Sequence, residues 1–357
     1  MKPVFFGSDI FRGSGYGAGH PLHIPRVWPV IDICRDMGWL ADGQYISVPV
    51  ARPDELALFH HPSYVAALQE AEQFQVLDIA RQTRHQIGIK GNPFYPEMYR
   101  RPATAAKASL MAAEMMLAGQ ARRLFNPSGG THHGMPDYAN GFCFVNDPAL
   151  AIARLLQGGA QKIAYLDIDA HHPDGIEAHF GTDARVSLYS VHEENRWPRT
   201  GTSGRKDRIW NQTLPRGSGD QPFLSAVMDG FLPDLVASKP DYVIVQAGAD
   251  ALRDDPQSGL AVSQSAYLCV IEACLDLPCP VLITGGGGYN PFTTARAWAA
   301  IWGLMIGIRR DEMAKLILPE TTQEMMKSLV FEHRLGRNKP LYWLARIIDP
   351  VCSEVDS

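Results

Sequence analysis

The sequence predicts an α/β fold: a single domain with a mostly parallel central sheet and helices on both faces. From about residue 124 to residue 306, short β-branched runs alternate with longer helical segments, which is the pattern of consecutive strand–helix units. Several short runs are apolar throughout, as strands covered on both faces are. No linker, low-complexity stretch or internal repeat interrupts this pattern. We therefore expect one domain over residues 1–357.

The elements follow from local composition. The predicted strands are rich in β-branched and aromatic residues and span 4–6, 46–50, 162–168, 186–191, 242–246 and 280–284. The predicted helices show helical spacing of apolar residues, or Pro and acids in a first turn, and cover 28–37, segments beginning at Pro53 and His61, 103–121, 148–156, 223–237, 263–275 and 293–306. Residues 13–23 and 85–102, rich in Gly, His or Pro, are expected to be loops. Residues 307–357 form a C-terminal extension of unknown role.

The composition excludes several classes of protein. The chain is 46% hydrophobic and 20% charged, with a net charge of −5, so neither nucleic acid nor an anionic membrane is an expected partner. Its six cysteines are scattered rather than arranged as a disulfide framework. There is no secretory-signal pattern and no run of 18 apolar residues. We expect a cytoplasmic protein, and a homo-oligomer is left open.

The run at 162–168 leads into acids and histidines, and the rest of the chain is organised around it. Alternation along a strand places Asp167, Asp169 and His171 on one side. Two carboxylates and an imidazole are costly to desolvate at the end of a buried strand unless they are paired or bind a metal. The alternative, a solvated acidic loop, is less favoured than metal binding.

Three other segments place polar residues after predicted strands or strand-like runs: 129–134, 246–250 and 284–290. The carboxyl ends of such strands converge on one crevice, so we expect one shared site. The adjacent side chains of His132 and His133 must diverge, and each needs its own carboxylate partner.

The sequence does not match the common motifs for nucleotide binding, serine hydrolases or H-E-x-x-H metalloproteases. Gly285 to Gly288 do not complete G-x-G-x-x-G, because position 290 is Asn, and no Lys-Ser/Thr follows for a phosphate-binding loop. No G-x-S-x-G motif for a serine hydrolase is present. The segment at 192–196 begins like H-E-x-x-H but ends in Arg. The glycines are more consistent with close backbone approach to a ligand.

Taken together, these segments resemble the zinc-dependent histone deacetylase superfamily, which has the arginase/deacetylase fold. The resemblance is carried, in order from Gly-His-Pro at 19–21 to about residue 306, by Gly-Gly-Thr-His-His-Gly (129–134), Asn-Gly-Phe-Cys-Phe-Val-Asn-Asp (140–147), Asp-Ile-Asp-Ala-His-His-Pro-Asp-Gly (167–175), Ala-Gly-Ala-Asp (247–250) and Gly-Gly-Gly-Gly-Tyr-Asn (285–290). It is strongest to prokaryotic acetoin-utilisation-type deacetylases. The resemblance implies an active site at the carboxyl ends of the strands.

The resemblance implies that Asp169, His171 and Asp250 hold Zn²⁺ and leave a position open for water and substrate. Fe²⁺ or Co²⁺ would also suit this ligand set. It further implies a structural monovalent cation, K⁺, beside Asp167, with Ser190 and backbone carbonyls.

The resemblance also implies the roles in catalysis. His132 and His133 would be backed by Asp167 and Asp174, one histidine accepting a proton from water and one donating to the leaving amine. In such enzymes the second histidine carries most of this work. Tyr289 would donate its hydroxyl to the oxyanion.

By the same resemblance, Phe142 and Trp197 would wall a narrow tunnel for an acyl-lysine chain, with Gly141 allowing close approach. Arg26 would line an inner channel for acetate. The chain departs from the family at three places, one of which is Thr131, where a larger, often apolar residue is common. Pro173 replaces a usual Gly beside Asp174 and stiffens that loop, and the rim acid expected near Lys90 and Gly91 is absent, which puts histone-like peptide recognition in doubt.

We therefore expect a metal-dependent amidohydrolase that removes an acetyl or similar acyl group from an acylated lysine in a protein or peptide, or from a small acylated amine. One alternative is an acetylpolyamine or other small-amide hydrolase. Another is a non-catalytic acyl-lysine binding protein. An arginase-like two-metal enzyme would need more acidic ligands beside Asp169 and Asp250.

Overall fold

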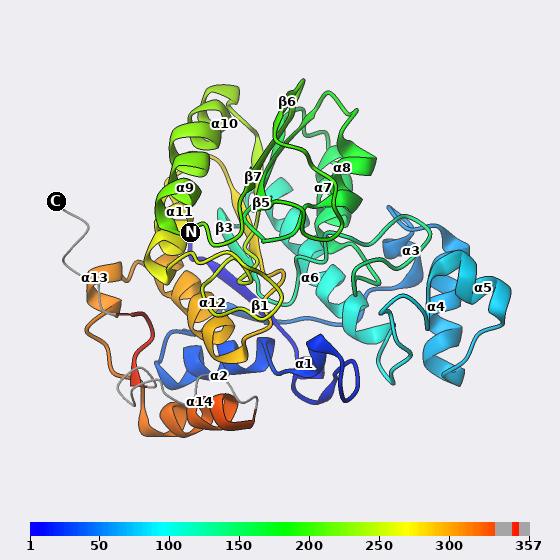
Figure 1. Ribbon diagram of the computed structural model, residues 1–357, viewed down its shortest axis with the longest axis horizontal. Coiled ribbons are helices and arrows are strands. Elements are labelled where there is room, and N and C mark those ends of the chain that lie inside the picture. Colours follow the sequence, from blue (N-terminus) through cyan, green and yellow to red (C-terminus); the bar gives the residue numbers. More distant parts are fainter. Residues whose placement is uncertain (333–344, 350–357) are drawn as a thin grey trace.

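A sheet forms the centre of the molecule (Figure 1). It has nine strands in the order β2-β1-β3-β9-β8-β4-β5-β7-β6. This computed structural model describes residues 1–332 and 345–349. All neighbouring strands are parallel except β6 and β7, which form an antiparallel hairpin. The strands are β1 Val4–Gly7, β2 Tyr45–Ser47, β3 Arg123–Asn126, β4 Ile163–Asp167, β5 Val186–Glu193, β6 Gly204–Lys206, β7 Ile209–Leu214, β8 Tyr242–Gln246 and β9 Val281–Thr284. The predicted mostly parallel α/β sheet is confirmed.

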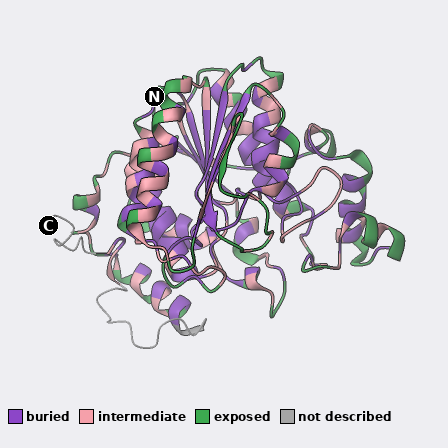
Figure 2. Ribbon diagram, turned by 45° about the horizontal axis from the view of Figure 1, so that its top comes forward, coloured by how far each residue is buried: buried purple, intermediate pink, exposed green. Residues whose placement is uncertain are grey.

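Helices cover both faces of the sheet, and the strands between them are buried (Figure 2). One hydrophobic layer contains α2 and α9 to α12, and the other contains α4, α6, α7 and α8. Strand residues alternate between the layers: Val243 and Val245 pack in the first and Ile244 in the second. The helices are α1 Ile10–Gly13, α2 Val27–Asp36, α3 Pro53–Leu56, α4 Pro62–Phe74, α5 Ile79–His85, α6 Arg100–Leu117, α7 Asp147–Gln157, α8 Asp174–Phe180, α9 Asp220–Leu224, α10 Leu232–Ser238, α11 Gln264–Leu275, α12 Pro291–Met305, α13 Arg310–Met313 and α14 Glu320–Glu332.

The structure differs from the predicted elements mainly at short segments. The strand expected at 46–50 is limited to β2, and the helix expected at 223–237 contains a π-helical stretch, Ser225–Phe231, between α9 and α10. The loop expected at 13–23 ends in a 3₁₀ turn, Pro21–His23. The helices α5 and α8 and the β6–β7 hairpin lie in segments without a clear periodic pattern of apolar residues, which is why the sequence did not predict them.

Part of the predicted C-terminal extension packs on the domain. Helix α14 lies against α2 and α12, and Thr322 Oγ1 donates to Asp36 Oδ2 at 2.7 Å. Arg296 on α12, almost fully buried, pairs with Asp349 at 2.8 Å. Residues 333–344 and 350–357 of this extension lie outside the described residues.

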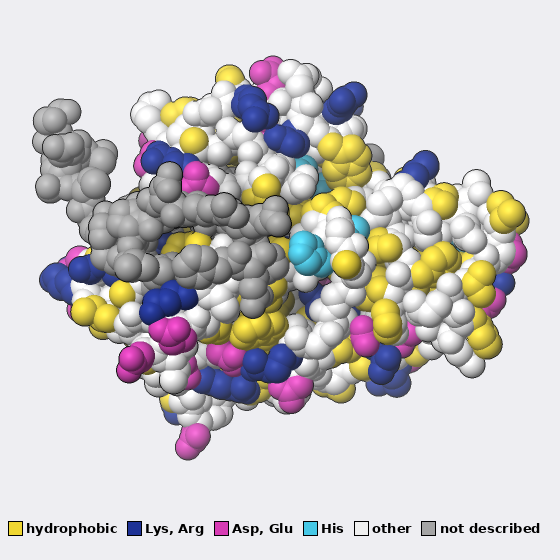
Figure 3. All heavy atoms as spheres, turned by 60° about the horizontal axis from the view of Figure 1, so that its bottom comes forward, with side chains coloured by type: hydrophobic (Ala, Val, Ile, Leu, Met, Phe, Trp, Pro, Cys, Tyr) yellow, Lys and Arg dark blue, Asp and Glu magenta, His cyan; other side chains and the backbone are white. Residues whose placement is uncertain are grey.

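Other expectations concern the surface. Within residues 1–332 and 345–349, none of the helices combines the length and apolarity that a membrane crossing requires. On the face drawn in Figure 3, Lys and Arg side chains are interspersed with Asp and Glu, and histidines are visible near its middle. The five cysteines in the described part of the chain are free thiols, and Cys352 lies outside it.

The parallel strands β3, β9, β8 and β4 are adjacent in the sheet, so their carboxyl ends meet at one edge. The four polar segments at 129–134, 167–175, 246–250 and 284–290 follow these four strands, and side chains from them line two adjoining cavities.

Candidate active site and metal centre

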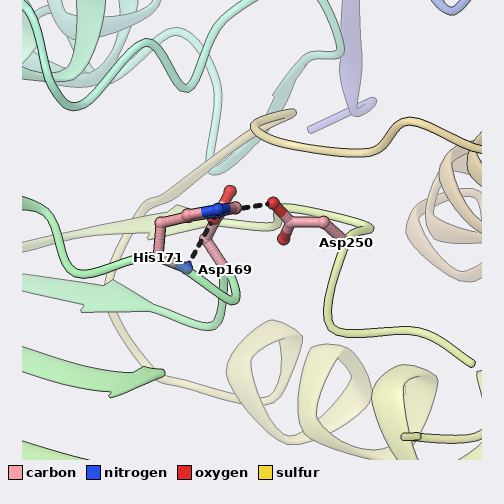
Figure 4. A group of neighbouring side chains, drawn as sticks. All are labelled: Asp169, His171 and Asp250. Carbon is pink, nitrogen blue, oxygen red and sulfur yellow. Dashed lines mark hydrogen bonds and ion pairs between the residues drawn. The ribbon is translucent and has the colours of Figure 1, made fainter. Parts of the chain in front are cut away.

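A buried cluster of two carboxylates and one imidazole lies at this edge (Figure 4). Asp169 and His171 come from the loop after β4, and Asp250 comes from the loop after β8. One potential ligand atom from each residue lies within 4.8 Å of the other two. His171 Nδ1 is 3.1 Å from Asp169 Oδ1 and 2.9 Å from Asp250 Oδ2.

The electrostatics of the cluster demand a positive charge between the carboxylates. Burial, and then the neighbouring charge of Asp169, raise the pKa of Asp250 to about 6. Burial lowers the pKa of His171, but Asp250 and Asp169 outweigh it and raise the value to about 10. A divalent cation would supply the charge that a proton on His171 otherwise provides.

Glycines bring the backbone close to these carboxylates. A Cβ on Gly287 would lie 1.9 Å from Asp250 Oδ2, and one on Gly248 would lie 2.0 Å from Asp169 Oδ2. Gly287 N and Gln246 Nε2 donate to Asp169 Oδ2 at 2.7 and 3.0 Å. The glycine run thus shapes a cradle around the carboxylates rather than a phosphate-binding loop. The cradle and its one-nitrogen, two-carboxylate donor set fit a divalent metal such as Zn²⁺, Fe²⁺ or Co²⁺.

The histidine pair lies beside this cluster, and each ring has its own carboxylate. His132 Nδ1 is 2.7 Å from Asp167 Oδ2, and His133 Nδ1 is 2.6 Å from Asp174 Oδ1. The expectation that the two side chains diverge is wrong: their Nε2 atoms are 3.0 Å apart and the ring centroids 4.0 Å. Both residues lie in a turn, where successive side chains need not alternate as they do in a strand.

The two histidines have opposite pKa shifts. Burial lowers the pKa of His132, but the charges of Asp167 and Asp169 outweigh it and raise the value to about 9. Burial, and then the charge of His132, lower the pKa of His133 to about 4. Near neutral pH, His132 is therefore the positively charged member of the pair, with both ring nitrogens protonated. His133 is neutral with Nδ1 toward Asp174, so its basic atom is Nε2, which accepts from the protonated His132 Nε2 at 3.0 Å.

A cavity of about 520 Å³ leads to these side chains, and the predicted tunnel residues Gly141, Phe142 and Trp197 line it together with His133, His171 and Tyr289. A Cβ on Gly141 would lie 2.3 Å from the Trp197 ring, so only glycine lets the walls approach this closely. The Trp197 ring centroid is 4.6 Å from that of His133.

A smaller cavity of about 40 Å³ lies further in. His171 and Tyr289 line both cavities. Arg26, expected in an inner channel, lines the smaller one, and its Nη1 donates to the Gly286 carbonyl at 2.7 Å. The two cavities therefore adjoin at the metal-type cluster.

Tyr289 is held through its backbone. Its N–H donates to Asp255 Oδ2 at 2.6 Å, and the next residue, Asn290, caps α12 by accepting from Thr293 N at 3.1 Å. Burial raises the pKa of Tyr289 well above its usual range, so the phenol keeps its proton and can donate a hydrogen bond.

Sequence reasoning missed three residues of the site. Asn140 Nδ2 donates to Asp174 Oδ2 at 2.9 Å, Gln246 supports Asp169, and buried Asp255 orients Tyr289. Asn140 and Gln246 stand within the motif segments, which was the available signal for them. Asp255 lies in a loop with no such signal.

The residues expected around a monovalent cation are neighbours in the sheet. Asp167 on β4 lies opposite Ser190 on β5. The Asp167 carboxylate accepts from Tyr165 OH at 2.6 Å and from Asp169 N at 3.0 Å, and Ser190 Oγ lies 2.9 Å from His192 Nδ1. Pro173, the residue least like the family, directly precedes α8 and so fixes where the helix carrying Asp174 begins.

Known proteins share both sequence and structure with this chain. The histone deacetylase domain model matches residues 20–305. The acetoin utilization protein AcuC of Bacillus subtilis (strain 168) is 29% identical over 85% of this chain and 82% of its own length, and histone deacetylase 8 of Xenopus tropicalis is 30% identical over 79% and 78%. The crystal structure of a histone deacetylase homologue from Aquifex aeolicus superposes with a TM-score of 0.89, at 30% identity over 98% of this chain and 95% of that one.

The matches cover most of each protein, so the similarity extends over the whole fold and includes the segments that form the site. The sequence resemblance and the arginase/deacetylase-like fold are thereby confirmed. Family membership supports a hydrolase that acts on acetylated amides. The chain belongs to the histone deacetylase family.

Proposed function

We propose that this protein is a zinc-dependent deacetylase that removes an acetyl or similar acyl group from an acylated lysine of a protein or peptide. The observation that carries the proposal is the convergence of four groups on one cavity. These are the metal-type cluster, the His132–Asp167 pair, the His133–Asp174 pair and the Tyr289 phenol. Such a set can activate water, protonate an amine and stabilise an oxyanion.

Asp169, His171 and Asp250 would hold the zinc ion; Fe²⁺ or Co²⁺ would suit the same residues. When bound, the cation polarises an acyl carbonyl and lowers the pKa of a water molecule. We assign K⁺ to the neighbourhood of Asp167 and Ser190, where it would offset the negative charge of the buried Asp167 carboxylate. Both assignments rest on the donor atoms these residues offer.

The chain's own residues would move the protons. The attacking water would take the place of His132 at His133 Nε2 and give its proton to that atom, while Asp174, 2.6 Å from His133 Nδ1, stabilises the imidazolium that forms. As the amide breaks, the histidine pair returns a proton to the leaving amine; His132, already protonated beside Asp167, keeps positive charge next to the reacting centre. The Tyr289 hydroxyl donates to the oxyanion, a contribution of roughly 3–4 kcal/mol for comparable donors.

The names of similar proteins support the same activity. Relatives carry the names acetoin utilization protein and histone deacetylase, and a solved histone deacetylase homologue complexed with SAHA superposes with a TM-score of 0.88. We infer that acylated lysine is the common substrate chemistry.

The scattered free cysteines favour a cytoplasmic protein.

Rival functions fit the site less well. An acetylpolyamine is a cation, and exposed Lys90 at the cavity mouth would repel it. Among residues 1–332 and 345–349, one metal-type cluster is found, Asp169, His171 and Asp250, whereas an arginase-like enzyme needs ligands for two ions. A binding protein would not need the proton-transfer set of His133 and Asp174.

A substrate panel tests the proposal. The zinc-loaded protein is incubated with an acetyl-lysine peptide, an acetylpolyamine and a small acetylated amide, and released acetate and free amine are quantified together. We expect equal amounts of acetate and free lysine, and the largest kcat/KM for the peptide. Turnover of the polyamine alone would favour the small-amide alternative, and binding without acetate release would favour a non-catalytic role.

A further inference from the structure

A tight turn at the cavity mouth carries a lysine at its tip. Lys90 and Gly91 are its central residues, with φ of 51° and 81°. The turn is closed by hydrogen bonds from Asn92 N to the Ile89 carbonyl at 2.9 Å and from Gly88 N to the Asn92 carbonyl at 2.7 Å. Two consecutive left-handed residues are typical of a rigid two-residue turn, so the backbone position of Lys90 is well defined.

The turn is attached to the tunnel wall. Asn92 is buried; its Oδ1 accepts from Phe142 N at 3.0 Å, and its Nδ2 donates to the Ala139 carbonyl at 3.2 Å. A Cβ on Gly91 would lie 2.8 Å from the Phe142 ring. Gly91 has no side chain, so Lys90 is the side chain that the tip of the turn presents to the mouth.

The charges around the mouth are unbalanced. Asp174, the acid among the lining residues, is largely buried and bound by His133 and Asn140. Arg196 is paired with buried Glu193 at 2.8 Å. Lys90 is exposed and forms no ion pair with any described residue. The mouth therefore offers one uncompensated cation on a rigid support and no uncompensated acid.

We propose that the mouth selects acyl-lysines flanked by Asp or Glu, with the Lys90 ammonium pairing with the substrate carboxylate. The inference rests on the proposed deacetylase function and adds a substrate class to it. An exposed pair of this kind changes kcat/KM by roughly twofold to fivefold. It is weakened by salt, because exposed charges are screened. Lysine suits the role because its long stem lets the ammonium follow a flexible peptide.

Charge reversal tests the proposal. Three peptides of equal length carry one acetyl-lysine flanked by Glu, Gln or Lys, and kcat/KM is measured for each at low and high salt. With the unmodified protein at low salt, we expect kcat/KM to be highest for the Glu peptide, intermediate for the Gln peptide and lowest for the Lys peptide. At high salt these differences should be smaller. In Lys90→Glu the order of kcat/KM should be reversed. In Lys90→Gln, which keeps a side chain of similar length, the three kcat/KM values should become nearly equal.

Lys239→Glu is the matched control. Lys239 is also exposed and has a φ of 50°. It precedes β8, however, and so lies at the amino-terminal ends of the strands, away from the cavity mouth. This variant should keep the order of the unmodified protein. Equal rates on all three peptides, or an order that Lys90→Glu leaves unchanged, would overturn the selectivity while leaving the deacetylase function standing. No turnover of any peptide would instead overturn the proposed function and this inference with it.

Discussion

Replacing Tyr289 with Phe should lower kcat on an acetyl-lysine peptide by roughly 10²–10³-fold, the loss seen when one oxyanion donor is removed. Tyr289 lines both the entrance and the inner cavity, and its hydroxyl keeps its proton because burial raises the pKa of Tyr289. The variant keeps the ring and the backbone bond to Asp255, so the pocket should stay intact. KM should change little, because the donor acts mainly in the transition state.

Two measurements separate chemistry from folding in this variant. Metal content and melting temperature should match those of the unmodified protein. Tyr242→Phe is a matched control. Tyr242 is also partly buried, but it is the first residue of β8 and so lies at the amino-terminal ends of the strands, away from the site. If kcat of Tyr289→Phe equalled that of the control, the oxyanion role would be wrong.

Replacing His133 with Ala should reduce kcat/KM by roughly 10²–10⁴-fold, the usual contribution of a positioned acid–base group. His133 is neutral near pH 7 because burial and the charge of His132 lower the pKa of His133 to about 4. His132 cannot substitute as base, because its pKa is raised to about 9 and it already holds a proton. His132→Ala should cost less, since it removes a supporting charge rather than the proton acceptor.

The comparison between the two histidine variants is the informative result. His61→Ala serves as a control, because His61 is an exposed residue at the start of α4. A larger loss in His132→Ala than in His133→Ala would exchange the two roles. Normal activity in both variants would contradict the proposed proton transfers.

The sequence predicted the parts of the site whose residue types and positions carry their own signal. Asp169, His171 and Asp250 stand directly after β4 and β8, where neighbouring parallel strands must bring polar residues together. The partners of the histidines were also predicted: Asp167 and Asp174 accept hydrogen bonds from His132 and His133.

What the sequence could not predict depends on contacts between distant loops. Asp255 is 34 residues from Tyr289 along the chain, and nothing in the local pattern indicates that contact. The approach of the His132 and His133 rings depends on the path of a turn, which residue types alone do not define. Lys90 was noted only as the absence of an acid; its position at the mouth follows from how Asn92 attaches to Phe142.

The same limit applies to the fold. Buried strands such as β8 and β9 were predicted because short, continuous, β-branched apolar runs are typical of parallel strands covered on both faces. The β6–β7 hairpin and α8 are short, and all three residues of β6 are exposed, so their sequences contain too few apolar positions for a period to be recognised.

Metal removal and reloading tests the central claim most directly. The protein is stripped with a chelator, assayed for acetate release from an acetyl-lysine peptide, then titrated with Zn²⁺ while bound metal and activity are measured on the same sample. We expect no turnover in the stripped protein and full recovery at about one ion per chain, as a single three-ligand catalytic site predicts. Asp250→Asn should lose both binding and recovery. Full acetate release by the stripped protein, or stoichiometric zinc binding without turnover, would contradict a metal-dependent deacetylase built on Asp169, His171 and Asp250.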